Sequence, residues 1–300
     1  MRIAENYRTA RFGFALALGL GGIVASPVLA EPYPTTVFPE GASHASVSSG
    51  PLTASIDLVR RPDLDPDFDT PVLTVSVDGY PVLEVAGVAS GFAFPATEAM
   101  IADLNTANAM PEVVFTSYSG GAHCCTLVIV AEQVGDRWIA VPIGDFDGDG
   151  RYLSDLDGDG SAEIATYDNR FLYEFDCYAC SAAPLRVIAV REGEARDVSA
   201  EPRYRAAHRD WLRQLEASAD PDGGWTSPGY LAGWVAAKIR VGEGTEALAA
   251  LEANWDFASD SGEEVCITGE DIEDCPRRYL KVLPFPERLR LFLERTGYLA

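Results

Sequence analysis

The chain has 300 residues, of which 47% are hydrophobic, 23% charged and 10% aromatic. This ordinary globular composition excludes the disordered and collagen-like classes. Acidic residues outnumber basic ones by 46 to 23, which gives a formal net charge of −23. Because binding to nucleic acid or anionic lipid needs basic side chains that replace counterions, we expect neither as a partner.

The first 30 residues have the pattern of a secretory signal peptide. Three arginines precede an apolar run at 12–24, and Val28-Leu29-Ala30 resembles a small-residue cleavage site. Glycines interrupt the apolar run, which is also short for a helix that spans a bilayer. No later apolar stretch is long enough to cross one. We therefore predict cleavage after Ala30 and export to the periplasm or the extracellular space, with no membrane span in the mature chain.

A β domain is predicted after a flexible lead-in. Residues 31–50 are rich in Pro, Ser, Thr and Gly, which is typical of a lead-in without regular structure. Between 51 and 200, short alternating segments are separated by turns and not by helices, which favours antiparallel sheets. Asp78-Gly79 is a strong hairpin signal among these turns. The predicted strands lie at 71–77, 80–85, 111–118, 125–131, 138–143, 163–167, 171–175 and 184–190.

The pattern becomes helical over 201–300. Residues 202–217 carry apolar side chains at helical spacing. Ser227-Pro228 is typical of a helix N-terminus, and the residues at 244–254 predict a second helix that forms an αα-hairpin with the first. A last helix is predicted at 286–295. The fold class is therefore α+β, with an antiparallel β domain followed by a C-terminal helical region.

One acidic loop has the spacing of a calcium site. Four acidic side chains stand at relative positions 1, 3, 5 and 9, with Gly160 at position 6; they are Asp155, Asp157, Asp159 and Glu163. Ca²⁺ takes about six to eight hard oxygen ligands, which such a loop supplies. An EF-hand has an acid at position 12, where this chain has Thr166. The loop instead resembles the DxDxDGxxD loop of FG-GAP and VCBS-type repeats, in which it connects strands. The alternative is a solvated acidic turn, but clustered carboxylates repel one another without a cation.

A second acidic loop lies just upstream and is less complete. It carries Asp145, Asp147 and Asp149 at the same alternating spacing, but position 9 is Leu153. The two loops are too close together for two propeller blades. Either they form one double calcium site, or the first loop is only an acidic turn.

Six cysteines in an exported chain predict three disulfides. Cys266 and Cys275 form the simplest pair. Adjacent residues on a strand point to opposite faces, so Cys124 and Cys125 reach separate partners more readily than each other. Cross-links from this pair to Cys177 and Cys180 are one option, and a strained vicinal disulfide is the alternative. A metal site built from His123 and these four cysteines, or a redox role for Cys177-Tyr-Ala-Cys180, are further alternatives.

Motifs spread over the chain resemble a group of exported bacterial proteins of unknown function. They are 119–125 (SGGAHCC), Trp138, 144–148 (GDFDG), 155–160 (DLDGDG), 168–173 (DNRFLY), 197–199 (DVS) and 292–298 (FLERTGY). The resemblance implies export and calcium binding.

We predict an exported protein with a structural calcium ion that acts as a binding or scaffold module for an unidentified protein or glycan, and not an enzyme. One alternative is a secreted hydrolase with its site between the sheets and the helices. The other is a thiol- or metal-handling protein that uses His123 and the nearby cysteines.

Overall fold

The computed structural model describes residues 33–39, 41–91, 96–121, 125–147, 152–219 and 224–299. The predicted signal peptide at 1–30 lies outside these residues. No helix in the described part of the chain is long and apolar enough to cross a membrane.

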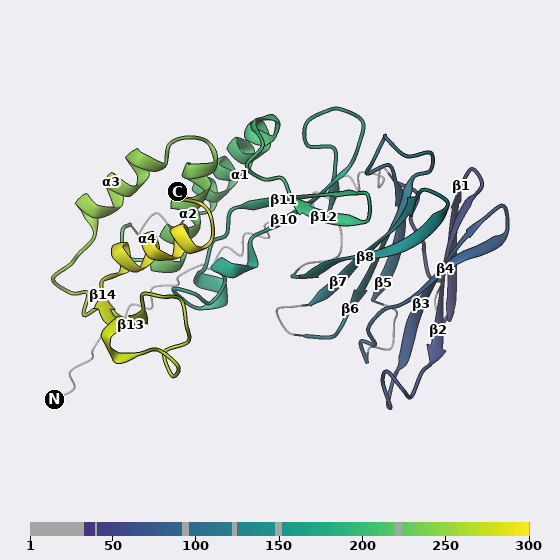
Figure 1. The fold of residues 1–300 in the computed structure, drawn as a ribbon, viewed down its shortest axis with the longest axis horizontal. Helices are drawn as coiled ribbons and strands as arrows, with labels where there is room; N and C mark the ends of the chain where they lie inside the picture. Colours follow the sequence, from purple (N-terminus) through teal and green to yellow (C-terminus); the bar gives the residue numbers. More distant parts are fainter. Residues whose placement is uncertain are drawn as a thin grey trace, which may run out of the picture. The chain divides into compact units, whose positions relative to one another are not determined.

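Two four-stranded antiparallel sheets come first in the chain (Figure 1). The first sheet contains β1 (His44–Ser49), β2 (Leu52–Arg60), β3 (Asp69–Val77) and β4 (Tyr80–Ala86) in that order. The second contains β5 (Thr97–Ala102), β6 (Glu112–Tyr118), β7 (Thr126–Val134) and β8 (Arg137–Phe146). The Asp78-Gly79 turn joins β3 to β4, and both residues have positive φ, 52° and 80°, as a tight hairpin turn requires.

The second sheet is buried on both faces. Alternate side chains of β6 point in opposite directions, so Val113 and Phe115 pack with Leu73 of the first sheet, while Val114 packs with Ile164 of the third. This double burial explains why three consecutive residues of β6, Val113, Val114 and Phe115, are all apolar and buried.

A third antiparallel sheet positions the acidic loop. Its strands are β9 (Leu153–Ser154), β10 (Glu163–Tyr167), β11 (Leu185–Arg191) and β12 (Glu194–Asp197), and their order is β12-β11-β10-β9. Because β9 pairs with β10 in the register Ser154↔Glu163, the residues between them form the loop of a short hairpin.

The helices follow in the chain, and all but the first share a core of their own. They are α1 (Arg205–Ser218), α2 (Pro228–Arg240), α3 (Gly244–Asn254) and α4 (Phe285–Arg295), with short 3₁₀ turns η1 (Asn169–Phe171), η2 (Tyr178–Cys180), η3 (Pro202–Tyr204) and η4 (Arg277–Tyr279). A two-stranded sheet of β13 (Glu263–Cys266) and β14 (Leu280–Leu283) lies between α3 and α4 in the chain. Phe171 and Phe175 pack into this core beside Leu231 and Leu289. This packing connects the segment that follows β10 to the helices.

The predicted α+β class with antiparallel sheets is confirmed. Three details differ from expectation. Residues 31–50, predicted as a flexible lead-in, contain β1, because Ala45 and Val47 pair with Ile56 and Ala54 of β2. The strand predicted at 171–175 does not form. The region predicted as helical contains the β13–β14 hairpin.

The segment 171–175 is a turn because polar contacts fix its start. Asp168 caps η1 by accepting a hydrogen bond from the Arg170 backbone N–H at 3.2 Å. Tyr173 then adopts φ 63°, a left-handed conformation that interrupts the extended backbone of a regular strand.

Candidate metal centre

The β9–β10 hairpin holds its acidic loop through backbone hydrogen bonds. The Asp155 carboxylate accepts from the Gly158 and Gly160 N–H groups at 2.8 and 3.1 Å. The carboxylates of Asp157 and Asp159 accept from the N–H groups two residues later in the chain. Gly158 and Gly160 have φ values of 79° and 92°, which a side chain would strain. The alternation of Asp and Gly therefore gives this loop its tight, inward-facing path.

Three carboxylates converge in the loop. Oxygen atoms of Asp155, Asp157 and Glu163 lie within 4.8 Å of one another. Asp159, the fourth predicted ligand, is not in this group, and its carboxylate lies near Arg203. The structure thus brings together three of the four predicted residues.

Glu163 is the buried member of the group, with 3% of its surface exposed. One carboxylate oxygen accepts a hydrogen bond from the Leu156 N–H at 3.0 Å, and the other accepts from the Tyr204 hydroxyl at 3.2 Å. Burial raises the pKa of Glu163, and the negative charges of Asp157 and Asp159 raise it further. A cation beside Glu163 would relieve this unfavourable environment.

A guanidinium group already lies next to the carboxylates. Nη1 of Arg203 is 3.3 Å from Asp157 and 3.7 Å from Asp159. One side-chain positive charge therefore faces a loop that carries four acidic residues, and the same arginine also pairs with Glu201 at 2.8 Å. The donor set consists of hard carboxylate oxygens, which suit Ca²⁺ or Mg²⁺ and not a soft metal.

Sequence reasoning missed Arg203, Tyr204 and Tyr33. Burial raises the pKa of the Tyr33 hydroxyl, and the nearby charges of Asp155 and Glu163 raise it further. Arg203 and Tyr204 belong to η3, some forty residues after the loop in the chain. No local pattern links these residues to the loop, because the tertiary fold alone brings them together.

The upstream loop is described only in part, since Asp149 lies outside the described residues. Asn169 donates a hydrogen bond to the Asp145 carbonyl at 3.0 Å, and the Tyr152 hydroxyl donates to the Asp147 carbonyl at 2.8 Å. Burial raises the pKa of Tyr167, as do the charge of Asp147 and a hydrogen bond to it. Asp145 and Asp147 join no group of three potential ligands within the described ranges.

The cysteines form disulfides. Cys177 pairs with Cys180, and Cys266 pairs with Cys275. Cys125 is also disulfide-bonded, whereas Cys124 and His123 lie outside the described residues. The option of cross-links from Cys124 and Cys125 to Cys177 and Cys180 is therefore wrong, because Cys177 and Cys180 pair with each other across a single 3₁₀ turn. Disulfide-bonded sulfurs cannot act as thiolate ligands, which also removes the described cysteines from the alternative metal site.

His208 has a structural environment. We expect from its predicted helix a surface or half-buried residue, but it is buried, and its Nε2 lies 2.8 Å from the Ser199 carbonyl. Burial lowers the pKa of this imidazole.

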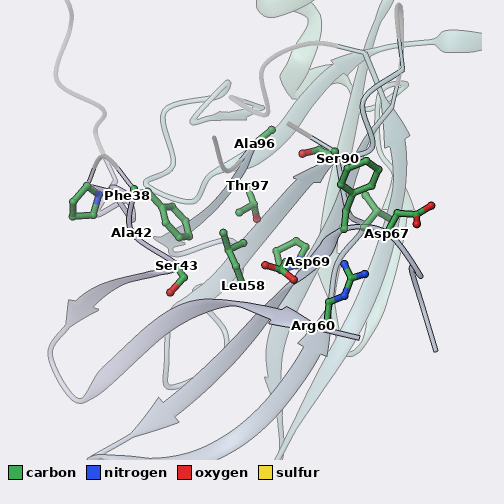
Figure 2. Close-up of a pocket in the computed structure, with 16 residues that line it drawn as sticks. Phe38, Ala42, Ser43, Leu58, Arg60, Asp67, Asp69, Ser90, Ala96 and Thr97 are labelled. Carbon is green, nitrogen blue, oxygen red and sulfur yellow. The ribbon is translucent and has the colours of Figure 1, made fainter. Parts of the chain in front are cut away.

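A cavity at the ends of β2 and β3 is the other large feature (Figure 2). Its volume is about 660 Å³, within the usual range of ligand pockets. Its charged lining residues are Arg60, Asp67 and Asp69, all of them exposed. The guanidinium of Arg60 donates to the Pro66 carbonyl. The lining residues therefore provide no buried ionisable group of the kind that marks a catalytic pocket.

Comparison with known proteins assigns the chain to a family. The probable thylakoid lumen protein sll0997 of Synechocystis sp. is 33% identical over 260 residues, which cover 85% of this chain and 76% of that protein. The chain belongs to the sll0997 family. The family described as the sll0997 C-terminal domain matches residues 206–297, the segment from α1 to α4. The acidic hairpin precedes this sll0997 C-terminal segment.

A second relative shares part of the chain. The uncharacterized protein y4bJ of Sinorhizobium fredii is 36% identical over 202 residues, which cover 65% of this chain but only 31% of that protein. No solved structure matches this member of the sll0997 family.

Proposed function

We propose that this protein is an exported, non-catalytic module that holds a structural Ca²⁺ ion in the loop between β9 and β10. The observation that carries the proposal is the approach of three carboxylates, from Asp155, Asp157 and Glu163, within 4.8 Å of one another. Protein carboxylates at such distances repel unless a proton or a cation lies between them. A divalent cation supplies more positive charge than Arg203 alone.

The donor set favours calcium among the hard cations. Three carboxylates offer up to six oxygens, and calcium accepts both single and paired carboxylate oxygens in flexible geometry. Mg²⁺ demands a near-ideal octahedron and keeps several waters, which a tight loop with clustered carboxylates accommodates less well. The resemblance of the loop to those of FG-GAP and VCBS-type repeats agrees with this choice. Asp159 would contribute only if its side chain left Arg203.

The role of the ion would be to fix the hairpin to the start of the helical region. Glu163 contacts Tyr204, and Asp157 contacts Arg203. Tyr204 is fully buried among Leu185 and Val187 of the third sheet. An ion bound at Glu163 and Asp157 would therefore strengthen the connection between the third sheet and η3, which leads directly into α1.

Three observations support export. The N-terminal pattern is that of a signal peptide, and the chain forms disulfides, which persist in oxidising compartments. The related sll0997 protein carries the name of a probable thylakoid lumen protein, and that lumen is also reached by export. For this chain we propose the periplasm or the extracellular space. A scaffold or binding role for a protein or glycan partner completes the proposal, with the bound ion serving the fold.

Calorimetric titration of the mature protein with Ca²⁺, and separately with Mg²⁺, tests the proposal. We expect about one Ca²⁺ per chain and much weaker binding of Mg²⁺. Asp157→Asn and Glu163→Gln are expected to abolish the calcium signal, whereas Asp136→Asn, an exposed acid in the β7–β8 turn, is expected to preserve it. A wild-type protein that takes up no calcium, or variants that bind as well as wild type, would contradict the proposed site.

A further inference from the structure

The Cys177–Cys180 disulfide lies on the protein surface, whereas the second described disulfide is buried. Both Cys177 and Cys180 are exposed. Cys266 and Cys275 are only 3% and 8% exposed. Thiol–disulfide exchange requires a thiolate to reach a sulfur of the bond, so accessibility decides which disulfide exchanges. Of these two disulfides, only Cys177–Cys180 is accessible to an attacking thiolate.

The Cys177–Cys180 disulfide also does little to hold the fold. It closes a loop of only two intervening residues, whereas Cys266–Cys275 spans nine positions. The stabilisation by a disulfide grows with the length of chain that it closes. Phe175 anchors the neighbouring backbone independently, because its buried ring packs edge-to-face on Phe285 and Phe292. Opening the Cys177–Cys180 bond would therefore leave this segment attached to the helical core.

A carboxylate and a helix N-terminus accompany the pair. A carboxylate oxygen of Asp176 lies within 4.8 Å of both sulfurs. The first turn of α2 packs against the same segment: a Cβ atom at Gly229 would lie 2.8 Å from the Cys180 carbonyl and 2.7 Å from the Asp176 Cβ. The positive end of a helix dipole favours negative charge nearby, such as that of a cysteine thiolate. The Asp176 carboxylate can exchange a proton with either sulfur, and the N-terminus of α2 can stabilise a thiolate.

Two tyrosines lie close to the disulfide in the chain. Tyr173 is 62% exposed and has a left-handed backbone, with φ 63°. Its ring centroid lies 5.5 Å from that of Tyr178, the residue that follows Cys177. A bulky residue with positive φ is strained and persists only where its surroundings hold it. The two rings form an aromatic surface next to Cys177 in the chain, which a peptide can contact.

We propose that Cys177 and Cys180 form a thiol–disulfide exchange site whose substrate is a peptide or protein dithiol. One substrate thiolate attacks a sulfur of the Cys177–Cys180 bond, which breaks and leaves a mixed disulfide. The second substrate thiolate attacks the substrate sulfur of that mixed disulfide and releases the cysteine. The substrate leaves as a disulfide after losing two electrons, and its two protons end on Cys177 and Cys180. Asp176 accepts each proton from an incoming thiol and returns it to a departing sulfur. This site is independent of the proposed calcium ion.

The test follows the oxidation of a synthetic peptide with two cysteines by the oxidised mature protein, without oxygen, at pH 7. We expect one peptide oxidised per protein, with the new protein thiols mapped to Cys177 and Cys180 by alkylation and mass spectrometry. The Cys177→Ala/Cys180→Ala variant is expected to lose the reaction while it keeps its melting temperature. Asp176→Asn is expected to slow exchange about tenfold or more, because a positioned proton carrier is absent. Asp274→Asn, the acid that precedes Cys275, is the matched control and is expected to leave the rate unchanged.

Equal peptide oxidation by the wild type and by the double alanine variant would overturn the proposal, as would thiols that map to Cys266 and Cys275. A large fall in melting temperature on loss of Cys177 and Cys180 would show that the disulfide is a structural clip and would also overturn it. An unchanged rate in Asp176→Asn would overturn the part assigned to that carboxylate.

Discussion

The Tyr204 hydroxyl donates a hydrogen bond to the Glu163 carboxylate at 3.2 Å, across 41 positions of the chain. Tyr204 ends η3, directly before α1, and Glu163 begins β10. The acidic hairpin and the start of the helical region are therefore connected by a buried polar contact. Burial and the charge of Glu163 raise the pKa of the Tyr204 hydroxyl, so it remains a donor at physiological pH.

Tyr204→Phe removes this donor and leaves one oxygen of a buried carboxylate without its protein partner. We expect a loss of about 1–2 kcal/mol in the free energy of unfolding, measured by urea denaturation in the presence of EGTA. Tyr80→Phe is the control, because Tyr80 is 76% exposed. An unchanged stability in Tyr204→Phe would mean that the contact with Glu163 contributes nothing to the fold.

Arg203→Gln tests whether this arginine and a metal ion compensate the same charges. In EGTA we expect a loss of about 0.5–1 kcal/mol, because the Asp157 and Asp159 carboxylates lose their positive neighbour. In calcium the loss should shrink, since the ion would supply the charge. Arg213→Gln, on the exposed face of α1, serves as the control. A loss of the same size with and without calcium would argue against a shared role.

Glu112 makes the free energy of unfolding depend on pH. This residue is fully buried in β6, and burial raises its pKa from 4.5 to about 7. Hydrogen bonds from Asn108 and the Leu104 N–H oppose that shift. Since the folded state holds this proton more tightly than the unfolded chain, the contribution of Glu112 to stability is complete below about pH 4.5. It is lost as the pH rises through about 7.

The size of the shift corresponds to a loss of about 3 kcal/mol between these limits. The prediction is checked by the free energy of unfolding of the wild type and of Glu112→Gln at pH 5 and pH 8. The wild type should lose more stability over this interval than Glu112→Gln, which has no proton to release. Identical pH profiles would show that Glu112 does not titrate in this window.

The parts of the fold that depend on local patterns could be predicted from the sequence. The Asp78-Gly79 hairpin forms because both residues accept the backbone conformation that the turn needs. Ser227-Pro228 marks the start of α2, and α2 and α3 form the expected hairpin around 241–243. At these positions a few adjacent residues are enough to predict the local structure.

Long-range contacts could not be predicted in the same way. Residues 171–175 were expected to form a strand from their apolar side chains, but Asp168 caps η1 and also accepts a hydrogen bond from the Tyr298 hydroxyl, 130 positions away. His208 is buried because its ring meets the Ser199 carbonyl. The spacing of the acidic residues predicts the ligands of the proposed metal centre. It does not predict Arg203 and Tyr204, since these residues approach the loop only in the folded chain.

The most direct test of the central claim is the melting temperature of the mature protein in calcium and in EGTA, compared with Asp157→Asn, Glu163→Gln and the control Asp136→Asn. With calcium at about a hundred times its dissociation constant, linkage gives about 3 kcal/mol of stabilisation. For a domain of this size, that corresponds to about 5–10 °C. We expect this shift in the wild type and in Asp136→Asn, and no shift in the two loop variants. A wild-type protein that melts at the same temperature in calcium and in EGTA would contradict the account, and the acidic loop would then be a solvated turn.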